Sequence, residues 1–147
     1  MNRFTVALAL LVCTASLCCQ TYTKGLQQGV VRADETSVTA TLRTIALTQK
    51  TYSVTSGGDY GTFKQLAQGD YLDSRFNAER PAMNNYVLTM TVTPKAEGKP
   101  EGFYTCNADP TGAGTQGGRH FYIDSTSPGL HVNPNAPATA QDPIAEP

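Results

Sequence analysis

The spacing of hydrophobic positions changes once along the chain, near residue 86. Before that point, between residues 30 and 54, the large apolar side chains recur at helical intervals. The stripe that they form consists of Val31, Val38, Leu42, Ile45 and Tyr52. The pattern predicts an amphipathic helix over about residues 28–54. Because this segment is rich in threonine, a mediocre helix former, the helix must pack its stripe against another element.

After residue 86 the apolar positions alternate with polar ones. Leu88, Met90 and Val92 are separated by threonines within residues 86–93, as in a strand with one buried face. Further short strands are predicted at residues 103–107, 119–124 and 130–132. Strands joined by short links favour an antiparallel meander, and only the helix can cover it. The predicted fold is α+β: one long N-terminal amphipathic helix packed on a three- to four-stranded antiparallel sheet.

The segments outside these elements are less regular. Residues 60–73 predict a turn and a short helix, with Phe63 and Leu66 on its inner side. Residues 74–85 are polar, and Pro81 interrupts any helix there. From residue 133 onward the chain consists of proline, alanine and polar residues with little to bury. We therefore expect residues 133–147 to be a disordered tail.

The N-terminus has the pattern of a secretion signal. Arg3 supplies one positive charge, residues 4–19 are mainly apolar or small, and residues 20–24 are polar. A membrane-spanning helix needs about 20 apolar residues, whereas the core of a signal peptide needs only about 7–15. We therefore expect residues 1–19 to be a signal peptide, residues 20–132 to be the folded domain, and the protein to be exported.

Three of the four cysteines, Cys13, Cys18 and Cys19, lie in that signal. The remaining Cys106 cannot form a disulfide within the mature chain, and we expect it to be a small buried strand residue. Cys19 or Cys18 is a candidate for a lipid anchor, although neither fits the Leu–small–small–Cys pattern of lipoprotein signals. Lipidation and plain cleavage near residues 16–19 both remain open. A single lipid would hold the domain on a membrane face without spanning it.

Composition limits the classes of partner. The 147 residues suffice for one domain, and the net charge is −1. Removing residues 1–19 changes this charge to −2, because Arg3 is the only charged residue among them. The sequence contains no run of lysine or arginine, and nucleic-acid binding needs such clusters to neutralise phosphates. We therefore expect no nucleic-acid partner.

Candidate chemical motifs are few. Residues 112–117 match a dinucleotide-binding fingerprint, but a strand follows them where a helix is required, which favours a hairpin loop. His120, His131 and Asp124 could meet and hold zinc, although solvated strand histidines are commoner. Asp109 offers one acidic side chain where calcium needs about six oxygens. We predict no catalytic residue, cofactor or metal site, and hence no enzyme.

Three local motifs resemble bacterial type IV pilins and type II secretion pseudopilins. The first is Arg32-Ala-Asp-Glu-Thr-Ser37, followed by Leu42-Arg-Thr-Ile45 and Gln49. The second is Tyr60-Gly61 with Leu66 and Tyr71-Leu-Asp73, and the third is Gly118-Arg-His-Phe-Tyr-Ile-Asp124 with Gly129-Leu130. In this order they cover about residues 30–132. The resemblance implies a pilin-like headgroup and pilus or secretion-system proteins as partners.

The N-terminus departs from that family. Prepilins present glycine and then Phe-Thr-Leu-Ile-Glu to a dedicated peptidase, whereas this chain has Arg3 in place of the glycine and Leu8 in place of the glutamate. Polar residues between 20 and 29 also interrupt the apolar run. We therefore expect a mature protein that is monomeric or weakly associating and forms no filaments by itself.

Two functions from different classes remain. The first is an exported structural or interaction protein, accessory to a type IV pilus or a type II secretion apparatus. The second is a small exported enzyme or ligand-binding protein that uses the same fold. A deep site on which His120, His131 and Asp124 converge would favour the second.

Overall fold

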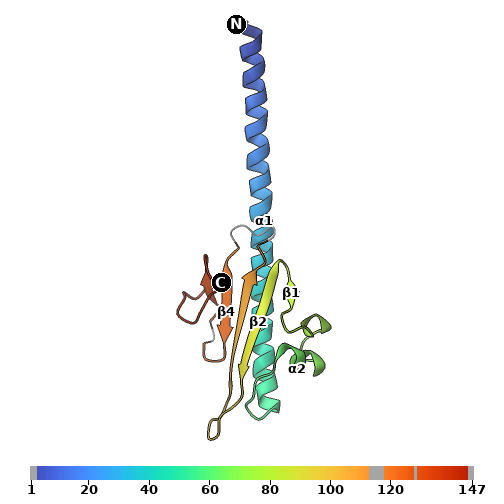
Figure 1. Ribbon diagram of the computed structural model, residues 1–147, viewed down its shortest axis with the longest axis vertical. Helices are drawn as coiled ribbons and strands as arrows, with labels where there is room; N and C mark the ends of the chain where they lie inside the picture. The colour runs from blue at the N-terminus through green and yellow to red at the C-terminus, as the bar shows by residue number, and fades with distance from the viewer. Residues whose placement is uncertain (1–2, 113–117, 128, 146–147) are drawn as a thin grey trace.

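The computed structural model describes residues 3–112, 118–127 and 129–145, with side chains from residue 25 onward. One long helix lies against an antiparallel sheet (Figure 1), which confirms the α+β prediction. The sheet has five strands, one more than the upper expectation of four. The elements are α1 (Arg3–Thr55), α2 (Phe63–Gln68), the 3-10 helix η1 (Ser74–Phe76), β1 (Ala82–Met83), β2 (Tyr86–Thr93), β3 (Phe103–Pro110), β4 (His120–Asp124) and β5 (His131–Asn133).

Helix α1 is longer than the expected residues 28–54, because it runs without a break through the polar stretch at 20–29. Its N-terminal part projects beyond the sheet as a stalk (Figure 1), and residues 25–30 are all exposed. The helix ends at Thr55, shortly before Gly57 and Gly58. These glycines adopt φ of 67° and 101°, a left-handed backbone that glycine permits and that stops the helix. No helix in the described part of the chain is long and apolar enough to cross a membrane.

The strands follow one another as an antiparallel meander in the order β1-β2-β3-β4-β5. Strand β2 has the predicted bounds, and β3 extends three residues beyond its prediction. Strand β1 lies in a region expected to be irregular. It forms because Asn84 and Asn85 adopt φ of 50° and 59°, which makes a two-residue hairpin turn between Met83 and Tyr86.

The core lies between α1 and the sheet. Val38, Leu42, Ile45 and Leu88 are fully buried there, as predicted. Met90 and Val92, expected to be equally buried, are only partly covered. The sheet contributes the side chains of alternate residues, including Tyr104, Cys106, Ala108, Phe121 and Ile123. Phe63 and Leu66 of α2 close one end of the core.

The expectation of a disordered tail is wrong for residues 133–145. Ala138 is 2% exposed, and its carbonyl accepts a hydrogen bond of 2.8 Å from the Asn107 side chain. Ile144 forms a β-bridge with His131, and the backbone N–H of Ala145 donates to the carbonyl of Leu130. The segment is held mainly by hydrogen bonds rather than by large apolar side chains, so its composition did not reveal its order.

Candidate functional site

An ion pair between Glu35 and Arg119 joins α1 to the sheet. Glu35, which is 8% exposed, accepts hydrogen bonds from the backbone N–H of Arg119 (2.9 Å), from Nε (3.1 Å) and from Nη2 (2.8 Å). The pKa of Arg119 is raised, chiefly by its side-chain hydrogen bond to this carboxylate. Both residues belong to the motifs that carry the pilin resemblance. Their contact fixes the helix against the start of β4.

Gln49 makes a second tie between α1 and the chain that follows it. Its side chain is fully buried, accepts from the N–H of Gly61 at 2.9 Å and donates to the Gly61 carbonyl at 2.6 Å. The side-chain amide of Gln49 therefore takes the place of a backbone hydrogen-bond partner for Gly61. It gives the buried N–H and carbonyl of Gly61 the hydrogen bonds that they need. In the sequence, Gln49 stands out as a polar residue on the otherwise apolar stripe of the helix, and this is the feature that could have indicated the contact.

Asp124 organises the turn between β4 and β5. One carboxylate oxygen accepts from the Thr126 N–H and hydroxyl and from the Ser127 N–H, and the other accepts from the Tyr122 hydroxyl. Burial alone would raise the pKa of Asp124, but these hydrogen bonds outweigh it and the pKa is lowered. Four donors occupy the carboxylate, so Asp124 acts as a structural acceptor in this conformation.

The three candidate metal ligands do not converge. His120 pairs with Asp109 of the neighbouring strand, with 2.6 Å between Nδ1 and Oδ1. His131 Nδ1 instead contacts the carbonyl of Asp142 at 2.7 Å, and its Nε2 lies 3.2 Å from the Ser127 hydroxyl. Within the residues that the structure describes, no group of three or more histidine, cysteine or acidic side chains is placed to hold a metal.

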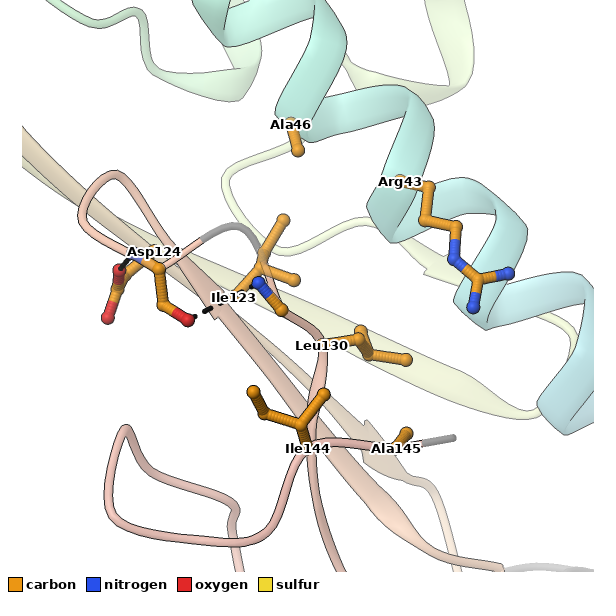
Figure 2. A pocket seen from close by; sticks show the side chains of 9 residues that line it. Arg43, Ala46, Ile123, Asp124, Leu130, Ile144 and Ala145 are labelled. Atoms are coloured by element: carbon orange, nitrogen blue, oxygen red, sulfur yellow. Dashed lines mark hydrogen bonds between the residues drawn. The ribbon is translucent and has the colours of Figure 1, made fainter. Parts of the chain in front are cut away.

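One pocket of about 270 Å³ lies between α1 and the β4–β5 turn. Figure 2 shows Arg43 and Ala46 of the helix across from the C-terminal residues Ile144 and Ala145, with Asp124 and Arg43 on opposite sides. Ile123 and Leu130 add to the apolar part of the lining. Its charged members are therefore an arginine at the edge and a carboxylate already occupied by neighbouring donors. Neither His120 nor His131 contributes to it.

Cys106 lies in the centre of β3 and is fully buried, as expected. Burial, and to a lesser extent the charge of Asp109, raises the pKa of its thiol well above the ordinary value. At neutral pH the group is therefore a protonated thiol rather than a nucleophilic thiolate.

Comparison with family models, curated proteins and solved structures gives no match to the chain. Two sequence predictions lie outside what the structure describes. The glycine-rich fingerprint falls almost entirely within residues 113–117, and the lipid-anchor candidates Cys18 and Cys19 precede the first described side chain. The lipid anchor therefore remains a prediction.

Proposed function

We propose that the protein is an exported structural or interaction protein, pilin-like in its headgroup and accessory to a type IV pilus or a type II secretion apparatus. The observation that carries this proposal is helix α1, whose N-terminal part projects beyond the sheet as a stalk and whose C-terminal part belongs to the core. After removal of residues 1–19, the exposed residues 25–30 would still form part of this stalk. This division suits a protein that presents a folded head at a distance from an attachment point.

The use of the polar side chains also supports the proposal. Glu35, Asp124 and His131 are each bound to neighbouring parts of the fold, as an inter-element tie, a turn acceptor and a contact to the C-terminal segment. The alternative of an enzyme or a ligand-binding protein depended on a site where His120, His131 and Asp124 meet. Asp124 and His131 both contact Ser127, but His120 pairs with Asp109 instead, so the three side chains do not form one site and that support is missing.

The test begins with compartment and processing. The gene, extended by a C-terminal tag, would be expressed in its native bacterial host, and each cell fraction would be analysed by intact mass. We expect the protein in the periplasm or outside the cell, without its first 16–19 residues. An added diacylglycerol mass would identify Cys19 or Cys18 as an anchor, whereas a cytoplasmic form that retains Met1 would overturn the proposal of export.

The accessory role needs a separate measurement. Chemical cross-linking in intact cells, followed by purification of the tagged head, should recover components of a pilus or a secretion apparatus. Glu35→Ala, which removes one polar contact between the helix and the sheet, should reduce this recovery relative to Glu97→Ala in an exposed loop. Recovery of the same proteins with an unrelated exported domain would contradict a specific role.

A further inference from the structure

The face of α1 that the sheet leaves exposed carries an uninterrupted seam of uncharged residues. The seam follows alternating steps of four and three through nine positions, and every one of them is exposed. These positions are Leu26, Val30, Ala33, Ser37, Ala40, Thr44, Leu47, Thr51 and Val54. Alternating steps of this kind define the contact line of a coiled coil.

The seam also gathers the apolar side chains that the fold leaves uncovered. Of the five large hydrophobic residues exposed among the described residues, four lie on it: Leu26 at 55%, Val30 at 52%, Leu47 at 70% and Val54 at 80%. The charged residues of the same helix segment lie off the seam: Arg32, Asp34, Glu35, Arg43 and Lys50. Exposed apolar residues gathered on one charge-free strip are typical of interaction surfaces.

The hydroxyl groups on the seam are already occupied. Thr44 donates to the carbonyl of Ala40 at 3.0 Å, and Thr51 donates to that of Leu47 at 3.1 Å. Ser37 accepts from the side chain of Asn84 at 2.6 Å. Because these oxygens are bonded within the chain, the threonines can offer their methyl groups to a partner at little desolvation cost.

We propose that the occupant of this seam is a second copy of the chain, aligned in parallel and in register. The residue types at the two kinds of seam position favour this arrangement. Val30, Thr44 and Thr51 share one position of the repeat with Ser37, while Leu26 and Leu47 share the other with Ala33, Ala40 and Val54. A branched residue at the first position and leucine at the second favour parallel two-stranded coiled coils. Because the sheet covers the opposite side of α1, the two sheets would then lie on the outer sides of the helix pair.

The neighbouring charges are compatible with this pairing. In a parallel pair, Arg43 and Lys50 border the partner's uncharged positions 48 and 55, so no like charges face each other. Parallel alignment also places the two stalks side by side, so that exposed Leu26 and Val30 gain cover. An antiparallel pair would send the stalks in opposite directions and leave each stalk unpaired beyond the overlap.

The association is expected to be weak. Ala33, Ser37 and Ala40 occupy the middle of the seam, and such small side chains bury little area. We expect a dissociation constant on the order of 100 μM, reversible and dependent on protein concentration. This value agrees with a chain that is monomeric when dilute and associates where a common anchoring surface concentrates it.

Sedimentation velocity of the full chain from about 10 μM to about 1 mM tests the proposal. The weight-average mass should rise toward that of a dimer. Leu47→Glu should abolish the rise, and the control Arg32→Glu, off the seam on the same helix, should retain it. Unchanged thermal melting of both variants would show that the headgroup remains folded. A monomer at the highest concentration, or association unaffected by Leu47→Glu, would overturn the proposal.

Orientation needs a second readout. In a background where Cys13, Cys18 and Cys19 are serine, Val54→Cys should form a disulfide-linked dimer under mild oxidation. Parallel, in-register pairing brings the two copies of residue 54 together, and Cys106 is buried and does not compete. Lys64→Cys on α2 is exposed but off the seam and should not cross-link comparably. Association without the Val54 cross-link would refute the parallel arrangement. The proposal depends only on the helix, so its failure would leave the proposed export and accessory role untouched.

Discussion

Glu35 and Arg119 join the first and last thirds of the domain across 84 positions of sequence. The carboxylate binds both the backbone and the guanidinium of Arg119. The contact therefore holds the backbone of Arg119 in place and also pairs two opposite charges. Glu35→Ala should lower the free energy of unfolding by about 2 kcal/mol, because it leaves a partly buried N–H and a guanidinium without their acceptor. Urea denaturation measures this change. Glu97→Ala in an exposed loop should stay within about 0.5 kcal/mol of the wild type.

The core between α1 and the sheet is tested by placing a charge at Ile45, which is fully buried. Ile45→Asp should lower the free energy of unfolding by about 4 kcal/mol, because the charge has no partner in a dry site. Leu47→Asp, at a 70% exposed position two residues further along the helix, is the matched control and should cost less than about 1 kcal/mol. If thermal melting barely moves for Ile45→Asp, the assignment of the core is wrong.

The sequence predicted those elements whose hydrophobic pattern is local. Val38, Leu42 and Ile45 defined the helix stripe, and the alternation at Leu88 defined β2. Contacts that depend on hydrogen bonds between distant residues could not be predicted. Gln49 bonds the backbone of Gly61, and the ordered tail is held through Ala138 without a large apolar anchor. The pilin resemblance and the assigned function remain predictions, because no related protein was matched.

Substitutions in the C-terminal segment test whether residues 133–145 are ordered against the sheet rather than disordered. Ala138→Glu should destabilise the domain by about 2 kcal/mol, since the side chain must enter a site that is now 2% exposed. Ala140→Glu, two residues later at an exposed position, should change stability by less than about 0.5 kcal/mol. Equal effects of the two substitutions in thermal melting would mean that the segment does not pack on the sheet.

Because of Asp124, we expect the free energy of unfolding to decrease in acid. The pKa of Asp124 in the folded protein is lowered by its hydrogen bonds, despite burial that acts in the opposite direction. The unfolded chain therefore binds the proton more readily, and the stabilisation is complete only above the unfolded pKa of about 4. It is lost as the pH falls through the lower folded value. Asp124→Asn should reduce stability at pH 7 and flatten its decline in acid, whereas Asp70→Asn in an exposed turn should preserve the slope in urea titrations.

Cys106 should resist thiol reagents. Because burial raises the pKa of its thiol and shields the sulfur, the native protein should show no fast reaction with a disulfide reagent at pH 8. In the variant whose signal cysteines are serine, one thiol should react after addition of denaturant. Rapid reaction of the native chain, followed by absorbance, would place Cys106 in an accessible environment and contradict its burial.

The long separation between Glu35 and Arg119 has a consequence for the newly made chain. The helix emerges from the ribosome first, while its partner strand is still 84 residues away. At about 5–20 residues per second, synthesis of that interval takes roughly 4–17 s. Val38, Leu42 and Ile45 have no sheet to cover them until β2 and β3 are made within this interval, and the tie to Arg119 follows last. The topology of the fold thus delays completion of the domain until the residues around Arg119 have been synthesised.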